Sequence, residues 1–256
     1  MSASVEVRRQ GAVATVVMIR PDLGNAVTPE QAGQLSEALE DLVEDPELRV
    51  VVLTGSGSSF NVGAFRPKDQ PRPAETDAAD KVANYERQVP VMRRVLELLG
   101  DERIVSVAAI NGACAGAGLA LALVADLRFA SERAGFNTAF LSAGLPGELG
   151  AVWWMSQLAG PGRAAGMFLL PRRLSADELL AAGILNGVYP HDQLEAAVAE
   201  LAARIAAYDP EVVRALKANL RDASSLTLAE YLPEEHRRMV ECLARAGRHT
   251  ATEKTR

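Results

Sequence analysis

One short segment constrains the fold more than any other part of this 256-residue chain. A β-rich run at 104–110 leads into a small-residue turn at 111–118, and residues 119–125 are then all apolar until Asp126. A helix that is apolar on every side has to be buried, so we predict a strand, a tight turn and a buried helix. The first N–H groups of such a helix lack partners and carry partial positive charge. They suit an anion or a developing oxyanion.

Composition excludes several classes of protein. Nearly half of the residues are apolar (48%), which is enough for a sizeable core, and the net charge of −6 argues against a general nucleic-acid binder. Only Cys114 and Cys242 are present, so we expect no disulfide framework and a reducing compartment. Without an apolar signal core or a membrane-length apolar run, we expect a cytoplasmic protein with no membrane partner.

Strands and helices alternate over most of the chain. We expect strands at 13–19, 50–53, 104–110 and 127–130, and helices that begin after Thr28, near Ala79 and near Glu148. Both 28–31 and 175–178 have the form of a capping box. Amphipathic helices are expected at 192–207, 210–221 and 227–243. We therefore predict an α/β core over 1–190 and a helical region over 191–256.

The order and spacing of several short motifs resemble the enoyl-CoA hydratase/isomerase (crotonase) family. These motifs lie at 20–21 with 25–26, 50–55, 59–64, 109–112, 126–131, 144–146, 182–186 and Lys217. The resemblance implies a spiral of ββα units with a helical C-terminal region that serves oligomerisation, in a homotrimer or a hexamer built as a dimer of trimers. It also implies a coenzyme A thioester as substrate.

The resemblance further implies where the chemistry takes place. Members of this family hold the thioester carbonyl with two backbone N–H groups and stabilise an enolate-like intermediate; by position these groups belong to Ala64 and Ala117. Backbone donors need only small residues that permit a close approach, which agrees with the sequence here. Arg66 and Lys68 could meet the coenzyme A phosphates, or they could belong to a solvated loop. The full expected set of coenzyme A contacts is Asn25, Ala26, Val62, Ala64, Arg66 and Lys68.

The chain departs from the hydratases of that family at the positions that move protons. Where those enzymes carry two glutamates, this sequence has Ala120 and Phe140, so we do not expect ordinary hydration through two carboxylates. The nearest remaining carboxylate is Glu148, which could shuttle a proton as in a double-bond isomerase. The alternative is that Glu148 is a first-turn residue stabilised by a helix dipole.

The other reactive side chains have simpler interpretations. Asp126 is expected to be a structural carboxylate, and Cys114 a small buried apolar residue. The three histidines lie in the expected helical region 191–256 without a metal-type spacing. We expect neither a metal site nor a prosthetic group.

Three functions remain open from the sequence. The first is an enzyme that acts on an enoyl-CoA or related thioester through an enolate, as an isomerase or a divergent hydratase or lyase. The second is a non-catalytic acyl-CoA-binding protein that has lost the hydratase chemistry. The third, a nicotinamide-dependent oxidoreductase, depends only on the alternation of strands and helices and on the weak glycine pattern of 55–57, which we interpret as a turn.

Overall fold

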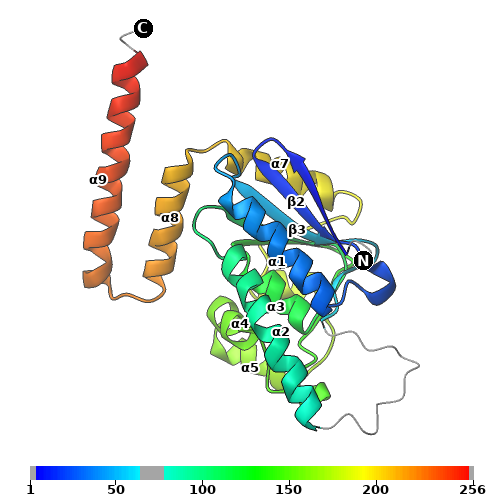
Figure 1. The fold of residues 1–256 in the computed structure, drawn as a ribbon. Coiled ribbons are helices and arrows are strands. Elements are labelled where there is room, and N and C mark those ends of the chain that lie inside the picture. Colours follow the sequence, from blue (N-terminus) through cyan, green and yellow to red (C-terminus); the bar gives the residue numbers. More distant parts are fainter. Residues whose placement is uncertain (1–3, 64–77, 254–256) are drawn as a thin grey trace. The chain divides into compact units, whose positions relative to one another are not determined.

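The computed structural model describes residues 4–63 and 78–253. Two compact units are present, Met1–Ile205 and Ala206–Arg256. The first unit holds all the strands and most of the helices (Figure 1).

Two sheets form the centre of the first unit. The larger sheet has the order β1-β2-β3-β5-β7-β10, in which only β1 and β2 are antiparallel, and the smaller has the order β4-β6-β8-β9. The strands are β1 (Val5–Gln10), β2 (Val13–Met18), β3 (Val50–Gly55), β4 (Ser59–Asn61), β5 (Val105–Ile110), β6 (Ala113–Ala115), β7 (Leu127–Ser131), β8 (Gly135–Asn137), β9 (Leu174–Ser175) and β10 (Gly187–Tyr189).

The chain winds between these sheets as a spiral. Each turn places one strand in the larger sheet and the next strand in the smaller one, as in β3 with β4, β5 with β6, and β7 with β8, and a helix follows each pair. This is the predicted spiral of ββα units. The short strands β4, β6 and β8 are parallel neighbours, so the loops around them meet at one place.

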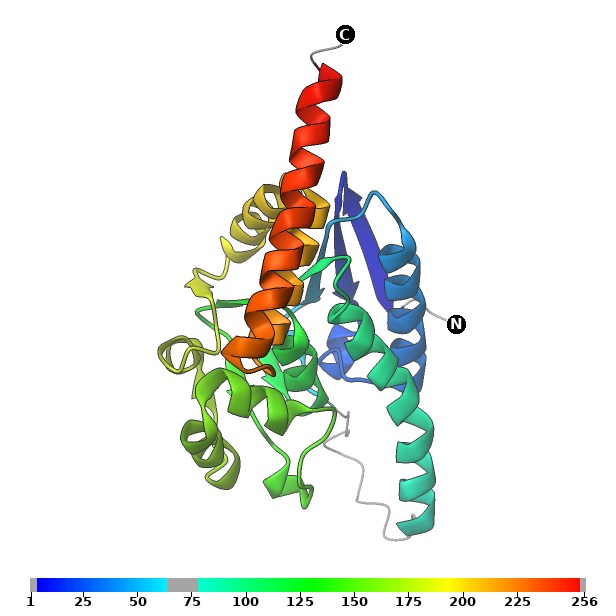
Figure 2. The same ribbon diagram turned by 90° about the vertical axis from the view of Figure 1, so that its left-hand side faces the viewer.

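Helices cover the sheets. Those of the first unit are α1 (Pro29–Glu44), α2 (Ala78–Leu99), α3 (Ala117–Val124), α4 (Ala151–Ala159), α5 (Pro161–Leu169), α6 (Ala176–Ala181) and α7 (Leu194–Ala206), whose last residue falls in the second unit, with short 3-10 turns at η1 (Pro21–Leu23) and η2 (Leu141–Ala143). Figures 1 and 2 show α1 and α2 running side by side. All six residues of β5 and all eight of α3 are buried, which confirms the predicted strand and apolar helix at the centre of the core.

Local signals explain most of the helix boundaries. Thr28 caps α1 by accepting a hydrogen bond from the Gln31 N–H, and Ser175 with Glu178 forms a complete capping box at α6. The predicted helix start near Glu148 is wrong, because α4 begins at Ala151. Positive φ angles at Leu149 (51°) and Gly150 (76°) keep this loop out of the helical conformation.

The second unit is a helical hairpin of α8 (Pro210–Ala223) and α9 (Leu228–Glu253) (Figure 1). Arg238 on α9 donates hydrogen bonds to Asn219 and Asp222 on α8 and so ties the two helices together. The compact division falls after Ile205, so most of α7 belongs with the first unit. Over the described residues, no helix combines the length and the apolarity that crossing a bilayer requires.

Candidate active site

The N-terminus of α3 lies where the small-residue turn meets the core. Gly116 precedes the helix with φ 55° and ψ −124°, a conformation that glycine adopts without steric cost. Within the described part of the chain, the N–H groups of Ala117 and Gly118 donate to no acceptor. The buried helix therefore directs two free N–H groups and the positive end of its dipole toward one spot.

A second loop presses against this helix end. Gly63 follows β4 with φ 79°, and a Cβ atom on it would lie 2.9 Å from the Ala117 nitrogen and 2.8 Å from the Ala115 oxygen. Only glycine fits so close an approach. The residue after Gly63 is Ala64, the other predicted donor, which lies outside the described residues together with Arg66 and Lys68.

The predicted coenzyme A contacts within the described residues gather beside Gly63. Asn25 and Ala26 are fully buried and Val62 is half-buried. The Val62 N–H donates to the Gly24 carbonyl at 3.1 Å, and the Val27 N–H donates to the Gly63 carbonyl at 2.8 Å. The loop after β2 is thereby joined to the loop after β4.

The Asn25 side chain is fully used by the protein itself. Its Oδ1 accepts from the Arg20 N–H at 2.8 Å, while its Nδ2 donates to the carbonyls of Ser56 and Ser59. Its main chain is bonded as well, because the Asn25 N–H donates to the Arg20 carbonyl at 2.8 Å and the Asn25 carbonyl accepts from Asn61 Nδ2. The side chain acts as a structural tie between loops, in the left-handed conformation (φ 55°) that asparagine tolerates.

Glu148 lies on the loop before α4, two residues ahead of its N-cap Gly150. It is therefore not the first-turn residue of the alternative interpretation. Its side chain is partly buried, and burial raises the pKa of this carboxyl above its usual value. Among residues 4–63 and 78–253, no group donates a hydrogen bond to this carboxylate and no cation pairs with it. A carboxyl with a raised pKa and no protein partner is suited to proton transfer.

At the two positions where the resemblance places the hydratase glutamates, this chain has apolar, buried residues. Ala120 lies within α3 and is fully buried. Phe140 is 4% exposed and stacks on Phe168 of α5 with ring centroids 6.1 Å apart. Neither residue can transfer a proton, so the described residues offer no pair of carboxylates at these positions.

The remaining reactive groups have structural roles. Asp126 accepts a hydrogen bond from the Ser106 N–H at 2.8 Å, as expected of a structural carboxylate. Cys114 is buried, which raises the pKa of its thiol, so the thiol is not primed as a nucleophile. Gly57 (φ 69°) turns the chain from β3 directly into β4, which confirms the turn and removes the dinucleotide interpretation. The described residues contain no cluster that could hold a metal ion.

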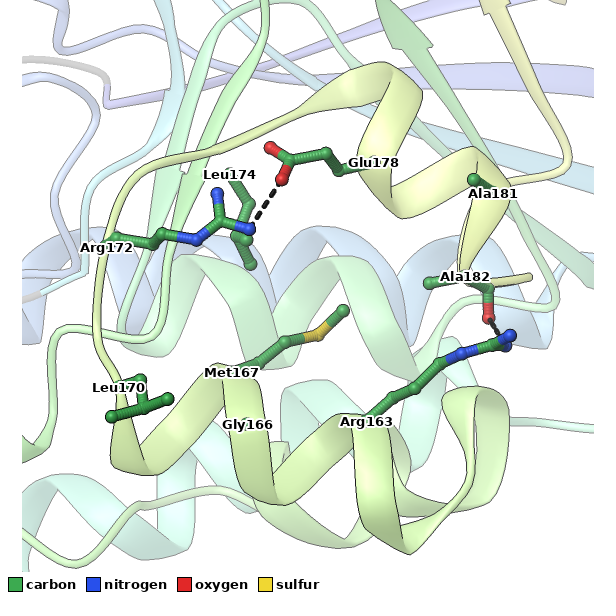
Figure 3. Close-up of a pocket in the computed structure, with 9 residues that line it drawn as sticks. All are labelled: Arg163, Gly166, Met167, Leu170, Arg172, Leu174, Glu178, Ala181 and Ala182. Carbon is green, nitrogen blue, oxygen red and sulfur yellow. Dashed lines mark hydrogen bonds and ion pairs between the residues drawn. The ribbon is translucent and has the colours of Figure 1, made fainter.

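A separate hollow of about 540 Å³ opens between α5 and α6 (Figure 3). Its lining is largely apolar, and Arg163 and Arg172 lie at its edges. Glu178 neutralises Arg172 at 2.5 Å, while Arg163 donates a hydrogen bond to the Ala182 carbonyl at 3.5 Å. The described lining of this hollow includes neither Ala117 nor Glu148 nor the predicted contacts Asn25, Ala26 and Val62.

Sequence reasoning missed Asn61 and Gly118. Asn61 is fully buried at the end of β4, and a Cβ atom on Gly118 would lie 2.1 Å from the Asn61 carbonyl oxygen. The glycine pattern carried a signal for the second contact, because a glycine within a helix commonly marks close packing. Asn61 lies in the motif 59–64 that carries the family resemblance, but nothing in the sequence gave its side chain a role of its own.

Comparison with known proteins agrees with this arrangement. The sequence model of the enoyl-CoA hydratase/isomerase family matches residues 8–254. The chain is 29% identical to 4-chlorobenzoyl coenzyme A dehalogenase-2 of an Arthrobacter species over 224 residues, which cover 88% of this chain and 80% of the relative. It is 30% identical to carnitinyl-CoA dehydratase of Salmonella typhi over 231 residues, with 90% and 85% covered.

Solved structures show the same fold. A Thermobifida fusca YX protein crystallised in complex with CoA is 27% identical, with a TM-score of 0.85 and coverage of 96% of this chain and 95% of that one. Because the family match spans nearly the whole sequence, the chain belongs to the enoyl-CoA hydratase/isomerase family.

Proposed function

We propose that this protein is an enzyme that acts on an enoyl-CoA or a related acyl-CoA thioester through an enolate-like intermediate. One observation carries the proposal: Gly63 lies against the Ala117 nitrogen, whose free N–H stands at the N-terminus of a buried helix. Relatives named as a coenzyme A dehalogenase and a CoA dehydratase, and a neighbour crystallised with CoA, support this class of ligand.

In this proposal the main chain stabilises the charge. When a base removes a proton from the carbon next to the thioester, negative charge develops on the carbonyl oxygen. The N–H groups of Ala64 and Ala117 would donate to that oxygen, and the α3 dipole would add a favourable potential. Since Ala117 lies among buried residues, these interactions act away from bulk water and are stronger there.

Glu148 would move the proton. Its carboxylate would take a proton from one carbon, leave a dienolate on the substrate, and return the proton to a carbon two positions away, which shifts the double bond. Its raised pKa lies closer to neutral pH than that of an ordinary carboxyl, and a general acid–base group works best when its pKa is near the operating pH. With Ala120 and Phe140 in place of the glutamates, we favour such an isomerisation over the addition of water.

The test is turnover of purified protein. Short- and long-chain trans-2- and cis-3-enoyl-CoAs would be supplied separately, and the products followed by mass spectrometry. We expect interconversion of the double-bond isomers, lowered at least ~10²-fold in Glu148→Gln. Glu132→Gln, a change at an exposed glutamate of the same unit, should retain full turnover. Tight binding without any turnover would instead support the non-catalytic acyl-CoA-binding alternative, and no binding would reject both.

We also propose that the helical C-terminal region mediates a homotrimer or hexamer. On α8, Val212, Leu216 and Leu220 follow one another at four-residue spacing and are 49–66% exposed, so they form an apolar face that the described residues leave uncovered. Light scattering should give a mass of three or six chains of 27.2 kDa. Leu216→Glu should lower that mass, and a monomeric wild type would reject the assembly.

A further inference from the structure

We propose that Asn61 is a positioning residue that holds Gly63 against the N-terminus of α3, where Ala117 carries its N–H, an inference that rests on the proposed function. Asn61 ends β4 and is fully buried. A buried asparagine side chain has to satisfy both ends of its amide. Here both ends bond to main-chain groups of the loops that form the site.

The two hydrogen bonds join separate parts of the chain. Oδ1 of Asn61 accepts from the Gly63 N–H at 2.8 Å, and Nδ2 donates to the Asn25 carbonyl. Gly63 is thereby held from one side by Asn61 and from the other by the Val27 N–H. Gly63 in turn lies so close to α3 that a Cβ atom on it would stand 2.9 Å from the Ala117 nitrogen, so the amide of Asn61 controls the approach of the β4 loop to α3.

The main chain of Asn61 adds a second contact to the same helix. Its carbonyl oxygen lies so close to Gly118 that a Cβ atom there would stand 2.1 Å away. Asn61 therefore touches the first turn of α3 through its main chain and fixes Gly63 through its side chain. A single residue links the loop that precedes one donor with the helix that carries the other.

The chemistry requires an amide at this position. The Gly63 N–H needs an acceptor and the Asn25 carbonyl needs a donor, and only an amide offers both at this size. An ionised aspartate would keep the acceptor but turn an oxygen toward the Asn25 carbonyl. An alanine would leave the Gly63 N–H without its acceptor and would remove the Asn61 donor from the Asn25 carbonyl.

The proposal is tested with Asn61→Ala and Asn61→Asp, beside Asn186→Ala as a matched control. Asn186 also accepts a main-chain hydrogen bond, from the Arg128 N–H at 2.8 Å, but lies elsewhere in the fold. We expect a fall in kcat of ~10- to 100-fold for Asn61→Ala, with KM nearly unchanged, because small misplacements of catalytic groups cost rate rather than binding. The control should keep the wild-type kcat.

Two readouts separate positioning from general loss of structure. The infrared carbonyl band of bound [1-¹³C]butyryl-CoA should shift less in Asn61→Ala than in the wild type, because fewer or longer hydrogen bonds reach the oxygen. Crystal structures without ligand should show a wider gap between Gly63 and the Ala117 nitrogen. If Asn61→Ala does not fold, Asn61→Asp serves in both measurements.

The outcomes distinguish the two proposals. If the wild type neither binds butyryl-CoA nor turns over enoyl-CoAs, the proposed function fails, while the crystal structures still test the role of Asn61. If the wild type shows the band shift and Asn61→Ala keeps both the shift and the Gly63–Ala117 contact, the positioning role is refuted.

Discussion

Gly118→Ala is the substitution for which the structure gives the clearest magnitude. The new Cβ atom would stand 2.1 Å from the Asn61 oxygen and 2.7 Å from its carbonyl carbon. A Cβ atom essentially never makes a non-bonded contact shorter than 3.0 Å. The strand β4 and the helix α3 therefore have to separate by about 0.9 Å. The obstructing atoms belong to the main chain, so no side chain can rotate away to accommodate the methyl group.

That displacement acts directly on the proposed site. Gly118 is adjacent to Ala117, and Asn61 holds Gly63, so the separation opens the gap across which the thioester oxygen would bind. A misplacement of about 1 Å in a catalytic group can cost ~10²-fold in rate, and overpacking a core contact costs about 1–3 kcal/mol of stability. We therefore expect a ~10²-fold lower kcat together with a stability loss in this range.

The assay compares Gly118→Ala with Gly33→Ala. Gly33 lies within α1, and a methyl group added there would meet no atom within 4 Å, so alanine at this position should leave turnover intact and raise stability by about 0.5–1 kcal/mol. Urea unfolding gives the stability, and steady-state turnover of the best enoyl-CoA gives kcat. The reasoning is refuted if Gly118→Ala matches the wild type in both quantities.

Three further outcomes follow from the described contacts. Glu148→Gln should raise the free energy of unfolding at neutral pH, because the raised pKa means that the folded state carries this charge at a cost. The gain in stability should vanish below about pH 4, where the carboxyl is protonated in both the folded and the unfolded state. Urea unfolding across a range of pH measures both effects. Phe140→Ala removes the stack on Phe168 and should cost about 3–5 kcal/mol, measured by urea unfolding at neutral pH. Arg128→Met leaves the Ile184 carbonyl without its 2.7 Å donor and should cost about 2 kcal/mol by the same method.

Periodicity and caps were enough to predict most of the long elements, although the strand β1 and the helix α5 were not predicted. The buried helix after the small-residue turn, the Ser175 capping box and the amphipathic α7, α8 and α9 all follow from local patterns that tertiary contacts do not override. The short strands β4, β6, β8 and β9 could not be predicted in this way. Each has two or three residues, which is too few for an alternation of apolar and polar residues to show, and each exists only because the spiral brings neighbours beside it.

The site was predictable only in part for a related reason. The free N–H of Ala117 follows from a helix that begins on glycine, which is a local property. The contact between Gly63 and Ala117 joins residues more than fifty positions apart, and no local pattern encodes that approach. The predicted helix start near Glu148 was wrong because Leu149 adopts a positive φ. Few non-glycine residues take this conformation, and no helix propensity predicts it.

The structure divides the proposed chemistry between two kinds of residue. Glycines that accept close main-chain contacts surround β4: a Cβ atom on Gly55 would lie 2.2 Å from the Ser59 oxygen, and one on Gly112 would lie 2.0 Å from the Ser58 oxygen. These contacts hold the backbone donors whatever acid or base is nearby. In the proposed mechanism, the side chain of Glu148 moves the proton. A family member can therefore have Ala120 and Phe140 at the positions where hydratases carry glutamates and still keep a thioester site. It follows that Gly118→Ala should weaken the polarisation of any bound thioester, whereas Glu148→Gln should leave that polarisation intact and stop only the proton transfer.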